Sequence, residues 1–244
     1  MSKSRNITNP PAVTTQSNDG SAPLCGALFH THTNKKGRFH VKHLILYIHG
    51  QGGSAAEAAH YQPLFPNCQV LGFDYQAQTP WEAAVEFPVF FGENCAGYDD
   101  IMVIANSIGA FFAMHGLAKK KISRAFFISP VVDMERLILQ MMEFDGVTEA
   151  ELADKKEILS STGQVLSWEY LCYVWTHPAD WPIPTAILYG EKDNMTAMDV
   201  IDHFAKTHGM LLNIMPKGEH WFHTAQQMEY LDNWMRTLLQ NYVM

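Results

Sequence analysis

The sequence has little positive charge and no long apolar run. It contains 17 Lys and Arg against 25 Asp and Glu, which gives the 244-residue chain a formal net charge of −8. This excess of acid argues against non-specific nucleic-acid binding, which needs a basic surface. No apolar run approaches the ~20 residues of a membrane-spanning helix, so we expect no membrane span.

Cysteine is also sparse. The four cysteines are far apart and form no Cys-x-x-Cys pair. The first 24 residues are rich in Ser, Thr, Asn and Pro and lack the apolar core of a secretory signal. We therefore expect a cytoplasmic protein with reduced thiols, a flexible tail at residues 1–24 and one folded domain at 25–244.

From residue 43 onward, apolar runs alternate with helical patterns. The runs expected to form strands are residues 43–50, 69–75, 101–107, 124–130, 185–193 and 211–220, and a last helix is expected over 222–242. Alternating strands and helices predict an α/β fold, with a mostly parallel sheet covered by helices on both faces. An antiparallel hairpin around residues 36–37 is a further candidate.

Local signals predict where two of the helices begin. Ser54 precedes Glu57 by three residues, which is the capping-box spacing, and a helix should start there. A second helix should start near Thr79, with Pro80 at its first position. Pro88 is expected to end or kink this second helix.

Residues 131–181 interrupt the alternation and show no strand pattern. Apolar residues at helical spacing form a stripe on one face: Met134, Leu137, Ile138, Met141 and Met142. We expect a helical insertion over the carboxyl edge of the sheet. The stripe would form the core of the insertion or line a pocket. The insertion holds ten acids and three bases, which form either a solvated face or a field that disfavours anionic substrates.

Ser107 lies where the run over residues 101–107 meets the following helix. A serine at so tight a turn is strained and projects above the sheet, and the residues two positions before and after it must be small. Ala105 and Gly109 meet that need. Ser107 is therefore either a nucleophile or a simple helix N-cap.

A serine nucleophile needs a base and an acid that orients the base. Asp193 follows the strand expected at 185–193, and His220 follows the one expected at 211–220. Their chain order, serine, acid and histidine, suits a parallel α/β sheet. Rival acids are Glu191 and Asp199, the second of which is expected in a capping box with Thr196. His223 is the rival base.

Acyl transfer also needs N–H donors for a negatively charged oxygen. The candidates are the backbone amides of Gln51, in the glycine-rich loop, and of Ile108, at the helix start. We expect His49 to stabilise this loop by bonding to backbone.

Four short motifs, His-Gly-Gln-Gly-Gly at 49–53, Ala-Asn-Ser-Ile-Gly at 105–109, Gly-Glu-Lys-Asp at 190–193 and Gly-Glu-His at 218–220, resemble those of the α/β-hydrolase family. The resemblance covers about residues 43–242 and departs from the family pattern at Ala105. It implies an eight-stranded, mostly parallel sheet, a helical lid and a Ser-Asp-His triad.

We therefore predict a serine hydrolase that cleaves a small or medium acyl ester, with Ser107, Asp193 and His220 as the triad. It would act on a small-molecule substrate and need no cofactor or metal. Peptidase or thioesterase activity, or ligand binding without turnover, are the alternatives. The residues expected to bind substrate are Met141, Met142 and Trp168. The sequence leaves the oligomeric state open.

Overall fold

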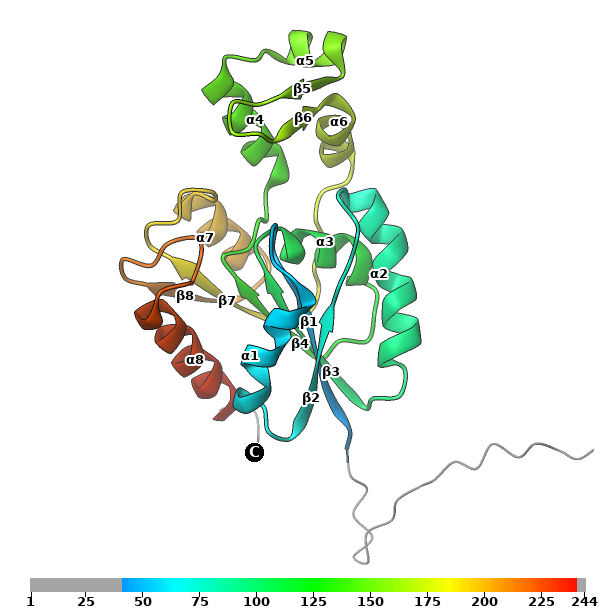
Figure 1. Cartoon of the computed structure of the whole chain (residues 1–244), viewed down its shortest axis with the longest axis vertical. Helices are drawn as coiled ribbons and strands as arrows, with labels where there is room; N and C mark the ends of the chain where they lie inside the picture. The colour runs from blue at the N-terminus through cyan, green and yellow to red at the C-terminus, as the bar shows by residue number, and fades with distance from the viewer. Residues whose placement is uncertain (1–40, 241–244) are drawn as a thin grey trace, which may run out of the picture. The chain divides into compact units, whose positions relative to one another are not determined.

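The structure, a computed structural model, describes residues 41–240 (Figure 1). The tail, the expected hairpin near residue 36 and the domain boundary at residue 25 lie outside these residues. The strands and longer helices, in chain order, are β1 (His43–Ile48), α1 (Ala58–Tyr61), β2 (Cys68–Phe73), α2 (Pro80–Cys95), β3 (Asp100–Asn106), α3 (Ile108–Leu117), β4 (Arg124–Ile128), α4 (Met134–Asp145), α5 (Glu149–Lys155), β5 (Glu157–Leu159), β6 (Val165–Ser167), α6 (Trp168–Thr176), β7 (Thr185–Gly190), α7 (Met198–Thr207), β8 (Leu211–Met215) and α8 (Ala225–Gln240).

Within the described residues, six strands form one sheet in the order β2-β1-β3-β4-β7-β8, and every neighbouring pair is parallel. The predicted strands are thus all present, although each is shorter than expected at its carboxyl end. The family resemblance implies eight strands, whereas the sheet formed by residues 41–240 has six.

Both faces of the sheet are buried. Alternate residues of β1 point to opposite sides, so that Leu44, Leu46 and Ile48 pack with α2, α3 and α7, whereas Ile45 and Tyr47 pack with α1 and α8. This double burial explains why the strands read as continuous apolar runs. The carboxyl ends of the strands meet at one edge, where the loops that carry the candidate site residues begin.

Helix α2 continues through Pro88 to Cys95, so the first of the two expected outcomes at Pro88, an end of the helix, is wrong. Its N-terminus is as predicted, with a Thr79–Glu82 capping box. Phe87 and Phe91, on either side of Pro88, are buried against the core. This packing holds the helix on the sheet, although Pro88 cannot donate a backbone hydrogen bond. Ser54 also caps as predicted, but the helix begins there as a 3₁₀ turn over Ala55–Glu57.

The insertion (residues 131–181) leaves the sheet after β4 and returns before β7 (Figure 1). It is not purely helical, because β5 and β6 form an antiparallel hairpin. Strands of three residues are too short to show a period, so the prediction missed them. In α4 the stripe residues Met134, Ile138 and Met142 are buried, as expected for the core of the insertion.

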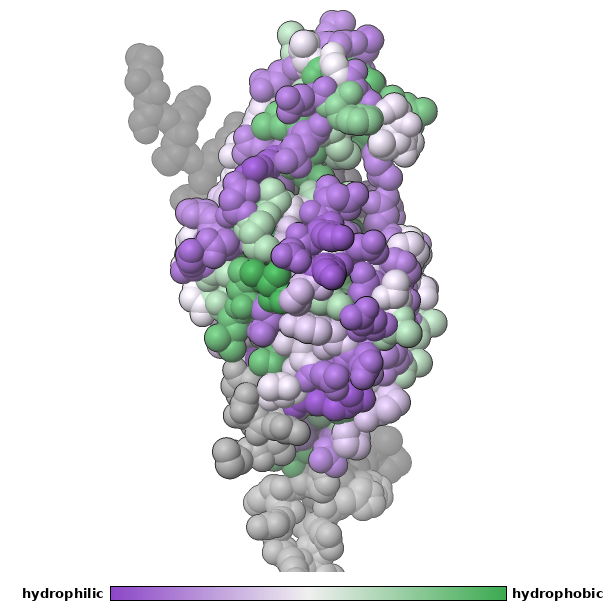
Figure 2. All heavy atoms as spheres, turned by 90° about the vertical axis from the view of Figure 1, so that its left-hand side faces the viewer, coloured by the Kyte–Doolittle hydropathy of each residue, from purple (hydrophilic) through white to green (hydrophobic). Residues whose placement is uncertain are grey.

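Hydrophilic side chains cover most of the visible surface of the insertion, at the top of Figure 2. Its exposed acids include Glu143, Asp154 and Glu169, which face solvent. Larger apolar side chains are exposed on the same part, among them Phe144, Leu159 and Val165. The acidic composition of the insertion therefore belongs mostly to a solvated face.

Candidate active site

Ser107 occupies a strained turn between β3 and α3. Its φ of 52° and ψ of −121° lie in a region that residues with a Cβ rarely adopt. Two backbone hydrogen bonds hold it there: Ser107 N–H donates to Ile128 O at 3.0 Å, and Val131 N–H donates to Ser107 O at 3.1 Å. No cap hydrogen bond forms from its side chain, which is thus free for another partner.

Small residues around Ser107 are required by close backbone contacts. A Cβ on Gly109 would lie 2.2 Å from the carbonyl oxygen of His49. A Cβ on Gly50 would lie 3.2 Å from the Cβ of Ser107. Ala105 is fully buried in β3, where its methyl group is accommodated by the core. The turn therefore brings the first strand's loop directly against Ser107.

The structure joins the three predicted triad residues in one hydrogen-bonded chain. Ser107 Oγ lies 2.8 Å from His220 Nε2, and His220 Nδ1 lies 2.7 Å from Asp193 Oδ2. The carboxylate can only accept, so Nδ1 carries the proton and Nε2 presents its lone pair to the hydroxyl. Both Met195 N–H and Thr196 N–H donate to Asp193 Oδ1, at 2.8 and 3.0 Å. The Asp193 side chain is fully buried, and that of His220 is 16% exposed.

Two glycines bring the loops of Asp193 and His220 together. A Cβ on Gly190 would lie 2.4 Å from Glu219 O, and one on Gly218 would lie 3.1 Å from the Cα of Gly190. The loops are also tied by Lys192 N–H, which donates to Gly218 O at 2.7 Å. Glu191, a rival acid, accepts from the backbone N–H of Lys217 at 2.7 Å. Glu191 is therefore part of the link between the loops, and the hydrogen bond to His220 within residues 41–240 comes from Asp193.

The other rivals are engaged elsewhere. His223 Nδ1 lies 2.6 Å from the carbonyl oxygen of Trp221. Asp199 pairs with Arg136 of the insertion at 2.9 Å, and this guanidinium lowers the pKa of the Asp199 carboxyl. The expected capping box of Asp199 with Thr196 is wrong, since α7 begins after Ala197 without a side-chain cap.

His49 supports the glycine-rich loop, as predicted. Its Nδ1 lies 2.8 Å from Gly50 O, and its ring stacks on Tyr75 with the centroids 4.3 Å apart. The hydroxyl of Tyr75 donates in turn to His49 O at 2.9 Å. These contacts fix the chain at the point where the loop leaves β1.

The two candidate oxyanion donors belong to the residue after Ser107 and to the loop that packs against Ser107. Ile108 is the first residue of α3, so its N–H has no acceptor within the helix. Gln51 lies in a turn closed by Gly53 N–H and Gly50 O at 3.1 Å, and Gly52 in this turn has a φ of 73°. Gln51 directly follows Gly50, the residue that packs on Ser107.

The residues predicted to bind substrate all lie in the insertion. Met142 is 3% exposed and belongs to its core, while Met141 and Trp168 are partly buried against the same core. The structure thus places Met142 away from any open surface. Trp168 also makes an edge contact with Trp175, at 5.5 Å between ring centroids.

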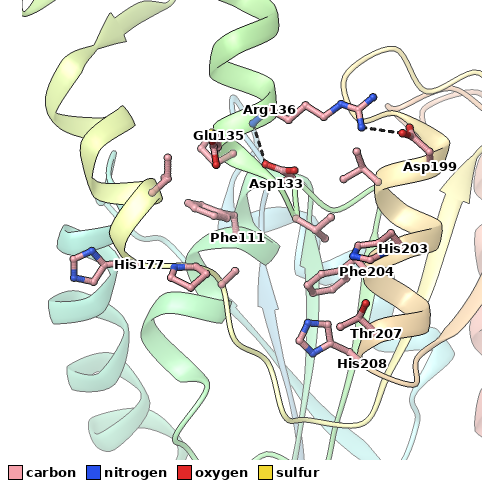
Figure 3. A pocket seen from close by; sticks show the side chains of 16 residues that line it. Phe111, Asp133, Glu135, Arg136, His177, Asp199, His203, Phe204, Thr207 and His208 are labelled. Atoms are coloured by element: carbon pink, nitrogen blue, oxygen red, sulfur yellow. Dashed lines mark hydrogen bonds and ion pairs between the residues drawn. The ribbon is translucent and has the colours of Figure 1, made fainter. Parts of the chain in front are cut away.

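A cavity of about 500 Å³ is lined by both ends of the insertion, by Phe111 of α3 and by α7 (Figure 3). Phe111 and Phe204 contribute apolar walls, and two histidines also line the cavity, His203 from α7 and His208 directly after it. The Arg136–Asp199 ion pair crosses its upper side. None of the triad residues or the predicted substrate residues lines this cavity, so it is separate from the hydrogen-bonded chain at Ser107.

Sequence reasoning missed residues that hold the site together. Gln227 is buried, and its Oε1 accepts from the backbone N–H of His223 at 3.1 Å and of Thr224 at 3.2 Å. Gln164 of the insertion contacts Gln51. A glutamine in a helix or a polar turn carries no pattern that distinguishes such a role.

Within residues 41–240, no three His, Cys, Asp or Glu side chains are placed to share a metal ion. No helix of the described range is long and apolar enough to cross a membrane.

The chain is similar to known proteins at the level of structure. No family model and no curated protein sequence matches the chain. Among solved structures, Est1E from Butyrivibrio proteoclasticus is similar with a TM-score of 0.66 at 18% identity, covering 83% of this chain and 88% of that one. Alpha/beta hydrolase domain-containing protein 10 from mouse has a TM-score of 0.65 at 13% identity, covering 81% and 90%.

A soluble variant of monoglyceride lipase from Saccharomyces cerevisiae has a TM-score of 0.57 at 13% identity, covering 84% of this chain and 88% of that one. The similar solved structures are α/β-hydrolase fold proteins. Together with the parallel sheet and its helices, they show that this chain has the α/β-hydrolase fold.

Proposed function

We propose that this protein is a serine hydrolase that cleaves a small or medium acyl ester. The observation that carries the proposal is the chain of hydrogen bonds from Ser107 Oγ through His220 to the buried Asp193. The strained turn that presents Ser107 supports it, because strain of this kind concentrates at functional sites. The name of one structural neighbour, a monoglyceride lipase, also supports the proposal.

In the proposed reaction, Ser107 Oγ attacks the acyl carbon while His220 Nε2 takes the hydroxyl proton. The backbone N–H groups of Gln51 and Ile108 would stabilise the negative oxygen of the tetrahedral intermediate. The ester C–O bond then breaks, and His220 returns the proton to the leaving alcohol. Water, deprotonated by His220, attacks the acyl-enzyme, and the acid is released as Ser107 regains its proton. Asp193 holds the His220 ring in the required tautomer throughout.

A serine-reactive fluorophosphonate probe tests this assignment directly. We expect it to label the wild type and fail to label Ser107→Ala. The control is Ser123→Ala, which replaces an exposed serine directly before β4, at the edge of the sheet away from Ser107, and it should label normally. Asp193→Asn should reduce kcat by on the order of 10⁴-fold. Labelling that survives Ser107→Ala would refute the role of Ser107.

A panel of esters, thioesters and amides with matched acyl groups separates the activities that share this triad. We expect the esters to be turned over fastest. Faster cleavage of the matched amide or thioester would make the protein a peptidase or thioesterase instead. Absence of both labelling and turnover would favour a ligand-binding protein of the same fold.

A further inference from the structure

A side-chain hydrogen bond connects the insertion to the glycine-rich loop. Gln51 Nε2 donates to Gln164 Oε1 at 3.0 Å, although the two residues are 113 positions apart. Gln164 lies at the end of the turn between β5 and β6. This hydrogen bond therefore joins the β5–β6 hairpin to the loop after β1.

The turn that presents Gln164 is itself well ordered by hydrogen bonds. Gln164 N–H donates to Ser160 Oγ at 3.0 Å, and Ser160 N–H donates to Gln164 O at 2.7 Å. Gly163 has a φ of 82°, which closes the turn. Ser161 N–H donates to Asp145 at 2.9 Å and ties the turn to the end of α4. The position of Gln164 is thus set by the insertion rather than by the loop that it contacts.

The glycine-rich loop needs such an anchor. Residues 50–53 include three glycines, and a Cβ on Gly52 would meet open space among the described residues. Glycine-rich segments have high conformational freedom, so external contacts must hold them in one arrangement. His49 and the packing of Gly50 on Ser107 fix the start of this loop. The hydrogen bond from the Gln51 side chain to Gln164 holds the turn of this loop.

We propose that Gln164 is a positioning residue, which holds Gln51 so that its backbone N–H is directed at the oxyanion beside Ser107. This inference rests on the proposed hydrolase function. It adds that the β5–β6 hairpin completes the active site from the insertion. If the hairpin moves away from the loop, the bond breaks and the donor loses its orientation, so that catalysis depends on the position of the insertion.

A double-mutant cycle in kcat tests the proposal, using Gln164→Ala, Gln51→Ala and the double variant with p-nitrophenyl butyrate. Each single variant should lower kcat about fivefold with KM changed less than twofold, as expected for one lost hydrogen bond that matters in the transition state. The double variant should resemble the single variants. Gln164→Glu keeps the acceptor and should retain at least half of the wild-type kcat. Val165→Ala, a neighbouring exposed residue, is the matched control.

Backbone amide hydrogen exchange gives a second readout that does not depend on activity. Residues 50–54 should exchange faster in Gln164→Ala than in the wild type, and at the wild-type rate in Val165→Ala. Unchanged exchange in Gln164→Ala, or multiplicative losses of kcat in the double variant, would overturn the proposal. Faster exchange in a protein that turns over no ester would instead retain the loop contact and refute the proposed ester hydrolysis.

Discussion

His115 should make the fold sensitive to acid. Burial, and secondly the nearby His177, lower the pKa of His115 from 6.5 to about 4. Its ring packs edge-on against Phe111, with centroids 4.5 Å apart, and against Tyr173 of α6 at 5.8 Å. Its Nε2 is buried without a hydrogen-bond partner among the described residues. A proton placed on this ring would therefore be a poorly compensated charge.

The direction of the pH effect on stability follows from the lowered pKa of His115. Well above pH 6.5 the ring is neutral in both the folded and the unfolded chain, so His115 imposes no penalty on folding there. As the pH falls from 6.5 toward 4, the unfolded chain binds a proton that the folded chain does not, so the free energy of unfolding decreases. The full shift of the His115 pKa corresponds to a loss of about 2 kcal/mol in the free energy of unfolding at pH 5. Because the ring is partly exposed, solvent screening reduces the expected loss to about 1 kcal/mol.

Urea unfolding at pH 7 and pH 5, followed by tryptophan fluorescence, measures this loss. His115→Phe keeps an aromatic ring at the site and should lose about 1 kcal/mol less than the wild type between the two pH values. His203→Phe, which replaces an exposed histidine, serves as the matched control and should behave as the wild type does. Equal pH dependence in His115→Phe and the wild type would refute the reasoning.

Substitutions of two glycines, of Gln227 and of Met142 probe the site, the helices and the insertion. Gly109→Ala should destabilise the fold by more than about 2 kcal/mol, because its Cβ would meet the carbonyl oxygen of His49. Gly92→Ala in α2 should instead stabilise the fold by about 0.5–1 kcal/mol, because alanine favours the helix and its Cβ would meet open space. Thermal unfolding of the two variants distinguishes these outcomes. Gln227→Met should cost about 1–3 kcal/mol by removing the acceptor of two backbone N–H groups, and an unchanged urea midpoint would contradict this role. Met142→Ala should cost about 2–5 kcal/mol and leave the acyl-length preference unaltered, so a changed preference measured with an ester series would show that the side chain reaches substrate.

The sequence allowed the strands and the turn at Ser107 to be predicted because their determinants are local. Continuous apolar runs specify buried strands, and the small residues two positions before and after Ser107 form a recognisable local pattern, although the contact that requires Gly109 is with His49 of the distant first strand's loop. Asp193 and His220 could be placed by chain order after the last strands. Their hydrogen bond depends further on the close approach of Gly190 and Gly218, which no local pattern reveals.

The features that could not be predicted depend on contacts between distant segments. The β5–β6 hairpin is too short for a periodic pattern and is fixed by its turn and by Asp145. The Gln51–Gln164 contact exists only because the insertion places its turn beside the first strand's loop. The continuation of α2 through Pro88 reflects the burial of Phe87 and Phe91, a tertiary effect that exceeds a local preference.

The strain at Ser107 leads to a last prediction, which compares Ser107→Gly with Ser107→Ala. The backbone at φ 52° and ψ −121° is unfavourable for any residue with a Cβ, by about 1–3 kcal/mol, and favourable for glycine. Glycine loses about 0.5–1 kcal/mol more conformational entropy on folding than alanine. The difference leaves Ser107→Gly more stable than Ser107→Ala by about 0.5–2 kcal/mol, measurable by urea unfolding. Ala105→Gly, in extended buried strand, should instead destabilise. If Ser107→Ala proves the more stable of the two, the turn is not strained, and its geometry cannot be used as support for a catalytic serine.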